Sequence, residues 1–187
     1  MKGLREMRSD DVVAVADLFT KYMQRFDMFP IFELEELKHH LLSGRGQGEV
    51  GDGGPGKRKG QVTWTYVVEV RTLRHFYLHA QILQDPDTGR ITDFFSFYSL
   101  PSTVINNTTY PTLEAAYLYY YATDAGLKSP KEQTPELNAR VQQLIGDAII
   151  VADRAKFDVF NALTLMDNVP ALTDLKVSIL QSWGDCC

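Results

Sequence analysis

The 187-residue sequence lacks any apolar run near the roughly 18 residues that a membrane-spanning helix needs, so we expect no transmembrane segment. Residues 1–6 lack the apolar core of a signal peptide, which leads us to expect a cytoplasmic protein. A formal net charge of -5 excludes the broad basic surface of a nucleic-acid-binding protein. Hydrophobic residues make up 44% and aromatic residues 11% of the chain, which indicates a folded globular protein.

Cysteine is nearly absent. The two cysteines, Cys186 and Cys187, are adjacent and cannot build a disulfide framework. A terminal Cys-Cys pair also occurs in prenylated GTPases, but no phosphate-binding P-loop accompanies it here, so we do not predict lipidation.

Histidine is also scarce, and no metal site is expected. His75 and His79 have the spacing of two ligands on a helix, but a zinc site needs further ligands. His39 and His40 are adjacent, and neighbouring residues on a helix do not face one another.

Residues 43–61 contain eight glycines and a basic run at 57–59. This composition predicts a flexible loop in which no residue is buried. A glycine-rich phosphate-binding loop is the alternative, but the segment lacks the closing Gly-Lys-Ser/Thr and a strand-to-helix context.

Hydrophobic periodicity and turn residues divide the rest of the chain into helices and strands. The stretch 112–123 is ambiguous, because its tyrosines favour a strand and its alanines allow a helix. The predicted helices are 12–26, 33–41, 134–149 and 168–176, and the predicted strands are 61–69, 91–99 and 157–165. Strands that precede a helix, followed by one further strand, indicate an α+β fold with a mainly antiparallel sheet.

One segment interrupts this pattern. A turn predicted at 85–90 would join the strands on either side into a hairpin, but residues 70–84 intervene. Valine codons begin with GT and glutamine can be written CAG, the letters found at intron borders. These letters favour a retained intron as the origin of residues 70–84.

The run Thr-Asp-Phe-Phe-Ser-Phe-Tyr-Ser-Leu-Pro-Ser-Thr-Val at 92–104 resembles a hallmark of the glycylpeptide N-myristoyltransferases. Tyr-Val-Val-Glu at 66–69, Ala-Ala-Tyr at 115–117 and Phe-Asp-Val-Phe-Asn-Ala-Leu at 157–163 are similar to the same family's C-terminal half. The glycine-rich loop resembles insertions in filamentous-fungal members. The resemblance implies one acetyltransferase-like half-domain over 1–187, with a mainly antiparallel sheet flanked by helices.

The resemblance also implies a function. Family enzymes transfer a myristoyl group from the co-substrate myristoyl-CoA to the N-terminal glycine of proteins, and no other cofactor is expected. The N-terminal half of such an enzyme holds the acyl-CoA and the oxyanion donors, and the C-terminal half supplies most of the peptide groove. Leu113 and Leu163 are equally well explained as core leucines. The positions that match groove residues are Ser102, Leu113, Tyr117, Asn161 and Leu163.

The resemblance implies that residues 70–84 are an insertion, because the family runs from Val-Val-Glu directly into a short turn. The sequence also departs from the family pattern at 177–187, where the family has Lys-Phe-Gly-x-Gly-Asp-Gly and a final strand. The family's catalytic base is its own terminal carboxylate, so no catalytic residue is assigned here. The expected partners are N-terminal-glycine peptides and the missing N-terminal half, and the chain alone is expected to be inactive. The alternatives are a peptide-binding module without catalysis and a truncated gene product with no cellular role.

Overall fold

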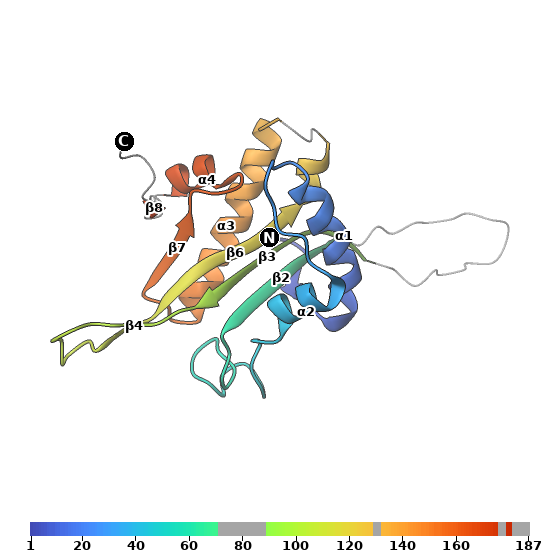
Figure 1. Ribbon diagram of the computed structural model, residues 1–187. Helices are drawn as coiled ribbons and strands as arrows, with labels where there is room; N and C mark the ends of the chain where they lie inside the picture. The colour runs from blue at the N-terminus through green and yellow to red at the C-terminus, as the bar shows by residue number, and fades with distance from the viewer. Residues whose placement is uncertain (71–88, 129–131, 176–178, 181–187) are drawn as a thin grey trace.

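The computed structural model of the chain describes residues 1–70, 89–128, 132–175 and 179–180 (Figure 1). The strands in this part of the chain are β1 (Leu4–Glu6), β2 (Thr63–Val70), β3 (Arg90–Ser99), β4 (Ser102–Thr103), β5 (Thr112–Leu113), β6 (Ala115–Thr123), β7 (Val159–Leu163) and β8 (Ile179–Leu180). The α-helices are α1 (Val12–Met23), α2 (Leu34–Leu42), α3 (Pro135–Arg154) and α4 (Asn168–Leu175), with short 3-10 turns η1 (Ser9–Asp11) and η2 (Asp124–Leu127).

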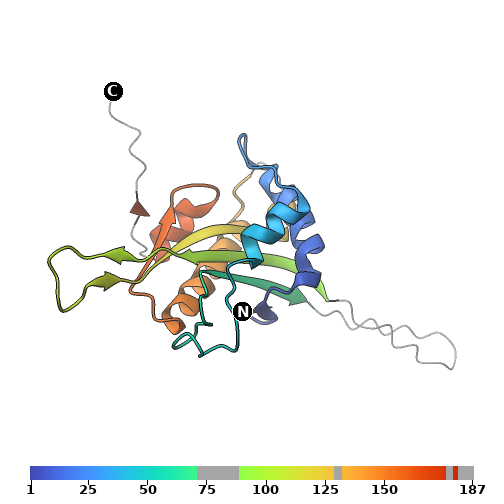
Figure 2. The same cartoon turned by 60° about the horizontal axis from the view of Figure 1, so that its bottom comes forward.

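Six strands form one sheet in the order β1-β2-β3-β6-β7-β8. The first four strands pair antiparallel, whereas β7 runs parallel to both of its neighbours. Strands β4 and β5 form a separate antiparallel ribbon, which projects away from the body of the molecule (Figure 2). The predicted α+β fold with a mainly antiparallel sheet flanked by helices is therefore confirmed.

Helices cover the two faces of the sheet. Helices α1 and α2 lie on one face, and α3 lies on the other, with α4 beside α3 and β7 (Figures 1 and 2). Helix α3 begins as its sequence predicts, because Thr134 Oγ1 accepts a hydrogen bond from the backbone N–H of Leu137 at 3.2 Å and Pro135 occupies the first turn. In the part of the chain that the structure describes, no helix has the length and apolar content needed to cross a bilayer.

Helix α1 begins at Val12, the first residue of the predicted helix 12–26. Ser9 to Asp11 form the turn η1, and the carboxylate of Asp11 accepts hydrogen bonds from the Arg8 backbone N–H and from the Arg5 guanidinium. The buried face of α1 matches the predicted apolar spacing. Its members are Val12, Val15, Leu18, Phe19, Tyr22 and Met23.

Aromatic residues in β2 and β3 build the centre of the core. The rings of Trp64 and Phe97 stack with centroids 5.3 Å apart, and Phe157 meets both at its edge. Aromatic pairs of this kind add about 0.5–1.5 kcal/mol beyond the burial of their surface. On the other face, Phe94 packs against Phe19 of α1 with centroids 6.1 Å apart. The aromatic residues of β3 therefore pack into the core on both faces of the sheet.

Two buried carboxylates tie helices to the sheet. Asp93 of β3 is fully buried and accepts two hydrogen bonds from the Arg140 guanidinium of α3. Asp167, which follows β7, accepts a hydrogen bond from the Tyr22 hydroxyl at 2.6 Å and lies 3.4 Å from Arg25 Nε. Such pairs fix the relative position of the elements they join, since removing one partner leaves a buried charge.

The glycine-rich loop contradicts one prediction, namely that none of its residues is buried. Gln61 is 9% exposed, and Lys57 lies 4.3 Å from the centre of the Phe157 ring. Lys57 also pairs with Glu114 at 3.0 Å, and the loop closes on itself through a bridge between Gln47 and Lys59. Composition alone misses such contacts because long basic side chains bury their aliphatic stems while the charge stays near water.

The ambiguous stretch 112–123 forms strands β5 and β6, with a break at Glu114, whose backbone N–H donates to Asp158. Predicted strand 157–165 is shorter in the structure, where β7 covers Val159–Leu163. Most of the insertion predicted at 70–84, residues 85–88 of the predicted turn, and the pair His75 and His79 lie outside the described residues. Within the predicted non-family tail 177–187, only Ile179 and Leu180 are described, and they pair with β7.

Candidate functional site

Two of the five predicted groove residues face each other across the β4–β5 ribbon. Ser102 of β4 pairs directly with Leu113 of β5. Ser102 is exposed, and Leu113 is half-buried. The ribbon continues the β3–β6 pair outward, because the Leu100 backbone N–H donates to the carbonyl of Ala115 at the start of β6. The Ser102–Leu113 pair thus lies just beyond the end of the main sheet.

Two more of the predicted residues form a second cross-strand pair. Tyr117 of β6 is directly opposite Asn161 of β7, and both side chains are half-buried. The Tyr117 ring stacks on Tyr98 of β3, with centroids 5.7 Å apart. Tyr98 lies four residues after Phe94, so by strand alternation it shares the face on which α1 packs. Tyr117 and Asn161 therefore present their side chains on the α1 face.

Leu163, the fifth predicted residue, lies two positions beyond Asn161 on β7 and so belongs to the same face. Its side chain is 49% exposed, which excludes the alternative that Leu163 is a core leucine. The structure thus brings the five residues into two neighbouring groups, Ser102 with Leu113 in the ribbon and Tyr117 with Asn161 and Leu163 on the sheet.

Strands β6 and β7 separate at this point. Their pairing covers only Ala115–Val159, Ala116–Phe160 and Tyr117–Asn161, although β6 continues to Thr123 and β7 to Leu163. We call the region between the two strands beyond the Tyr117–Asn161 pair the β6–β7 splay; Figure 1 shows β7 turning away from β6 there. Three of the predicted groove residues therefore lie at the closed end of the splay or on its β7 side.

A β-bulge in β6 shapes the wall of the splay. Phe97 pairs with Leu118 and Phe95 pairs with Tyr121, so Tyr119 and Tyr120 both lie opposite Ser96. Ser96 Oγ accepts a hydrogen bond from the Tyr120 backbone N–H at 3.1 Å and donates one to the Tyr120 carbonyl at 2.9 Å. The Ser96 hydroxyl thus satisfies the Tyr120 N–H and C=O groups, which the bulge prevents from pairing with the backbone of β3.

The bulge places tyrosine rings against α2. The Tyr119 hydroxyl lies 3.2 Å from His40 Nδ1, and the His40 ring packs against Phe32 with centroids 4.8 Å apart. Burial raises the pKa of Tyr119 and of Tyr120 above the ordinary value for tyrosine. Both phenols therefore stay protonated at neutral pH, and the wall offers hydroxyl donors next to aromatic surface.

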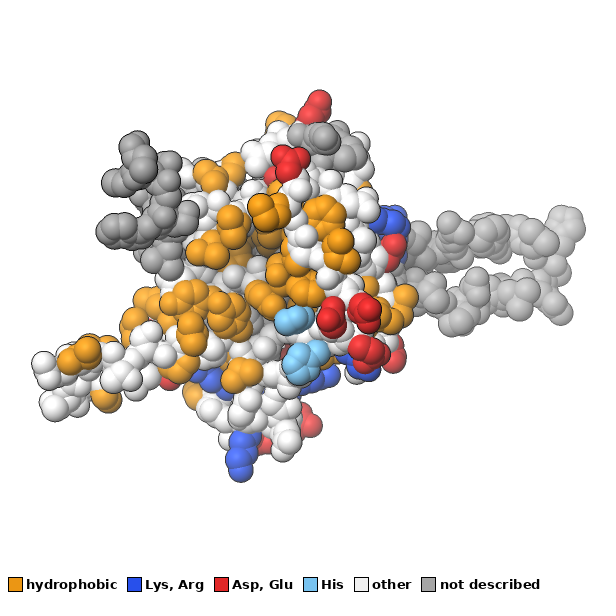
Figure 3. All heavy atoms as spheres, viewed as in Figure 1, with side chains coloured by type: hydrophobic (Ala, Val, Ile, Leu, Met, Phe, Trp, Pro, Cys, Tyr) orange, Lys and Arg blue, Asp and Glu red, His pale blue; other side chains and the backbone are white. Residues whose placement is uncertain are grey.

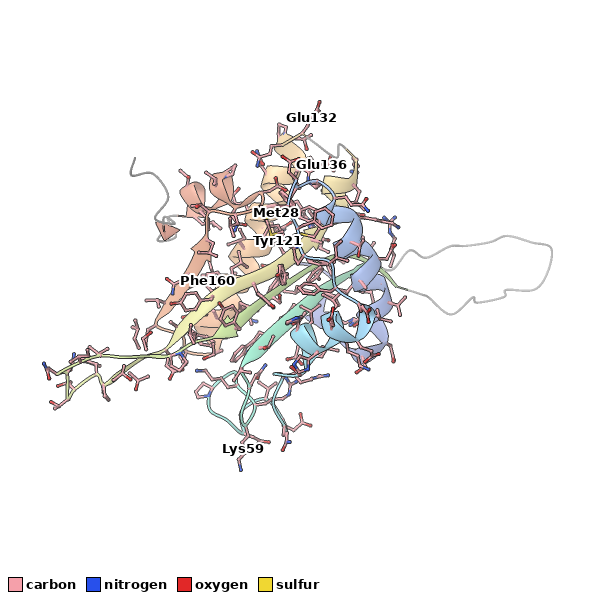
Figure 4. All side chains as sticks on the ribbon, viewed as in Figure 1. Met28, Lys59, Tyr121, Glu132, Glu136 and Phe160 are labelled. Carbon is pink, nitrogen blue, oxygen red and sulfur yellow. The ribbon has the colours of Figure 1, made fainter. Side chains whose placement is uncertain are left out.

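Figure 3 shows that apolar side chains gather over this face, around β6, β7 and the loop after α1, and that the two described histidines and a group of acidic residues border them. The loop after α1 contributes Met28 and Ile31, which are 91% and 86% exposed; Figure 4 labels Met28 on this loop and Tyr121 and Phe160 on the sheet. Leu165 and Val169, which follow β7, are also exposed. A surface of this kind, apolar with a polar border, is typical of a binding site.

One cavity lies away from this face. A cavity of about 10 Å³, room for one water molecule, opens between α2 and β2 near Thr63, Thr65 and Gln61, and it is too small for a peptide or an acyl chain. Over the described residues, no three potential metal ligands come together. His39 is exposed, and the His40 ring contacts Tyr119.

Comparisons with known proteins decide the family. Residues 1–182 match the model of the C-terminal domain of myristoyl-CoA:protein N-myristoyltransferase. The chain belongs to the N-myristoyltransferase family. Glycylpeptide N-tetradecanoyltransferases of Schizosaccharomyces pombe and Saccharomyces cerevisiae are 42% and 43% identical to it over 93% of its length. The matches cover 32% and 34% of these relatives, so the chain spans about a third of their length.

Solved structures agree with this membership. A crystal structure of Saccharomyces cerevisiae N-myristoyltransferase with bound myristoyl-CoA superposes with a TM-score of 0.75 at 40% identity, covering 95% of this chain and 35% of that one. A predicted acetyltransferase from Clostridium acetobutylicum superposes with a TM-score of 0.59 at 10% identity, which shows a shared fold only. The acetyltransferase-like fold implied by the family resemblance is therefore confirmed.

Sequence reasoning did not single out two residues that shape the wall of the splay. Ser96 stabilises the bulge through its hydrogen bonds to the Tyr120 backbone. The sequence pattern that indicates such a role is a single serine within a run of aromatic residues. From the sequence, His40 is interpreted with His39 as a residue suited to the C-terminus of a helix, where positive charge is favoured, and the structure also places its ring against Tyr119 and Phe32. An imidazole in the last turn of an amphipathic helix, on the side of its buried leucines, indicated such a packing contact.

Proposed function

We propose that this chain forms the acceptor-binding part of an enzyme that transfers a myristoyl group from myristoyl-CoA to the N-terminal glycine of proteins. The observation that carries the proposal is the strand register, which sets Tyr117 opposite Asn161 and Ser102 opposite Leu113. The curated relatives named glycylpeptide N-tetradecanoyltransferase support the same reaction.

The chemistry of these side chains suits a peptide. Within the described part of the chain, the Asn161 side-chain amide has no hydrogen-bond partner, so it can offer one donor and one acceptor to a peptide backbone. Tyr117 and Leu163 supply apolar surface on either side of it. Mixed polar and apolar groups of this kind fix the orientation of an extended ligand and bury its side chains.

The reaction joins two substrates. The glycine nitrogen attacks the thioester carbonyl, a C–N bond forms, the C–S bond breaks and CoA leaves as the thiol, while the amine gives up a proton. An α-amine has a pKa of about 7.7–8.0, so a base must first remove its proton at neutral pH. We assign neither this base nor the oxyanion donors to the described residues, and we propose that they and the myristoyl-CoA site belong to a partner region that packs against this domain. The proposal includes a cytoplasmic location, since the chain lacks the disulfide framework of small secreted domains.

A titration tests the binding step. A fluorescently labelled octapeptide that begins with glycine is added to the purified chain and to the Asn161→Ala variant. Loss of one or two hydrogen bonds is expected to weaken binding about 3- to 30-fold. The matched control is Asn138→Ala on α3, on the opposite face of the sheet, which should leave the affinity unchanged. Absence of saturable binding to the unmodified chain would contradict the proposal.

The second candidate is a peptide-binding module without catalysis, and the one-third coverage of the relatives favours it for the chain alone. A transfer assay with radiolabelled myristoyl-CoA and the same peptide separates the two. We expect binding without turnover for this chain by itself, and robust turnover would show that the catalytic groups lie within it.

A further inference from the structure

We propose that Asp167 is a positioning residue for acceptor binding, because its buried contacts fix the end of β7, the strand that carries Asn161 and Leu163. Asp167 follows Leu163 by four residues, and it acts through the chain of β7 and not by contact with a ligand. This inference rests on the proposed function and extends it, since it names a residue outside the candidate site on which the affinity for the acceptor depends.

The first observation is that side chains from three other parts of the chain converge on Asp167, which is 4% exposed. One carboxylate oxygen accepts a hydrogen bond from the Tyr22 hydroxyl of α1 and lies 3.4 Å from Nε of Arg25, which follows α1. The other oxygen accepts from Nε2 of Gln133, just before α3, at 3.1 Å. The backbone N–H of Asp167 donates to the hydroxyl of Tyr121 on β6, which Figure 4 labels. We call these five residues the Asp167 clamp.

The clamp is shielded from water, so water cannot readily replace a lost partner. Tyr22 and Tyr121 are fully buried, and the side chain of Arg25 is 4% exposed. Burial raises the pKa of both tyrosines above the ordinary value, so both hydroxyls stay protonated. Loss of one partner would leave a buried polar group or a buried charge unsatisfied, and the segment around Asp167 would have to move to relieve it.

The second observation is an unfavourable backbone conformation beside the clamp. Met166 has a φ of 57°, in the left-handed region that residues with a Cβ rarely adopt. Such a conformation persists where the surrounding contacts determine it, and the contacts of Asp167 with α1 and β6 supply that constraint. We therefore expect residues 166–168 to relax when the clamp is weakened.

The third observation connects these residues to the candidate site. Asn168, the neighbour of Asp167, is buried and donates from Nδ2 to the carbonyl of Leu163 at 2.7 Å. Leu163 lies beyond the Tyr117–Asn161 pair, where the pairing of β7 with β6 ends, and the two-residue strand β8 pairs with it on the other side. The segment held by the clamp thus replaces β6 as the support for this end of β7. Its movement would displace the side chains of Leu163 and Asn161.

Deletion of single hydroxyls tests this role while keeping the size of each side chain. Tyr22→Phe removes the donor to the carboxylate of Asp167, and Tyr121→Phe removes the acceptor of its backbone N–H. The matched control is Thr65→Val, which removes another buried hydroxyl, bonded to the Leu41 carbonyl at 2.7 Å between α2 and β2. Urea titrations establish that each variant folds, and we expect all three to lower the midpoint of unfolding.

Affinity for the labelled glycine-initiated octapeptide then separates a positioning role from a purely structural one. We expect Tyr22→Phe and Tyr121→Phe each to weaken binding about 3- to 10-fold, and Thr65→Val to change it by less than about 2-fold. If all three variants bind as tightly as the unmodified chain, the positioning role is wrong and the proposed function stands. Failure of the unmodified chain to bind would contradict both.

A second readout needs no ligand and uses the amide resonances of the isotope-labelled chain. We expect Tyr22→Phe to shift the resonances of Asn161 and Leu163, because the change passes from Asp167 along the segment to β7. Thr65→Val should leave these two resonances in place. Shifts that stop at residues 166–168 would show that the clamp only ties α1 to this segment, and they would overturn the proposal.

Discussion

Ser96 is a polar residue in the most aromatic strand of the molecule, and its position is explained by a neighbouring strand. It lies fully buried opposite two residues of β6, and its hydroxyl serves both backbone groups of Tyr120. Buried backbone groups are costly when unpaired, so a hydroxyl at this position stabilises a bulge that a purely apolar strand would disfavour. The bulge in turn places Tyr119 against His40.

Replacing Ser96 by alanine should therefore affect stability and the site together. We expect Ser96→Ala to lower the free energy of unfolding by about 1–3 kcal/mol in urea titrations, because both Tyr120 groups lose their partner. The control is Ser99→Ala, half-buried at the end of the same strand, which should cost about 0.5 kcal/mol or less. Equal effects of the two substitutions would show that the Ser96 hydroxyl does not support the bulge.

At the scale of elements, the glycine-rich loop shows where composition misleads. Its glycines and charges predicted a segment without burial, yet Gly56 lies against the last turn of α3 and Lys57 against Phe157. The spacing of hydrophobic residues predicted the helices and most strands correctly, because the buried face of a helix or strand is visible in the sequence of that element alone. Contacts between a loop and a distant helix depend on the whole fold, and no local pattern encodes them.

Two glycines of this loop make a matched pair for testing that contact. Gly56 and Gly60 have nearly equal positive φ angles, 67° and 68°, but a Cβ on Gly56 would come within 2.6 Å of the Arg154 carbonyl oxygen, whereas Gly60 has nothing within 4 Å. Gly60→Ala should cost about 1–2 kcal/mol from left-handed strain alone. We expect Gly56→Ala to cost about 1–3 kcal/mol more in thermal or urea unfolding. Equal costs would mean that the loop does not pack on α3.

The loop is also joined to β1 by charge, and this contact should depend on pH. The Arg58 guanidinium, which donates hydrogen bonds to both carboxylate oxygens of Glu6, lowers the pKa of Glu6 below its ordinary value of 4.5. A lowered pKa in the folded state means that the pair stabilises the fold above pH 4.5 and that this contribution disappears as the pH falls through the lowered pKa.

Comparison of the unmodified chain with Glu6→Gln checks this dependence. At pH 7 the difference in unfolding free energy should be about 1 kcal/mol or less, since the pair is partly exposed. The difference should shrink as the pH is lowered below the ordinary glutamate value. Glu35→Gln, which removes an exposed pair with Lys38, is the control and should show almost no effect at any pH. A difference that grows on acidification would contradict the assigned pKa direction.

At the scale of the whole molecule, the sequence predicted the fold class and the family, and the resemblance supplied the five groove candidates. The register that pairs Tyr117 with Asn161 joins residues from two strands separated by helix α3, and residue periodicity carries no information about such pairings. The parallel direction of β7 and the splay beside it follow from the same crossover. These features locate the candidate site, and they became visible only with the three-dimensional structure.

The central claim is that acceptor peptides bind at the end of the sheet where β6 and β7 separate. Amide chemical-shift mapping with an isotope-labelled chain and an unlabelled glycine-initiated octapeptide tests this claim most directly. The account predicts saturable shifts concentrated at Ser102, Leu113, Tyr117, Asn161 and Leu163, with little change along β1 and the outer surface of α3. Shifts confined to β1 or α3, with those five amides unmoved, would contradict it.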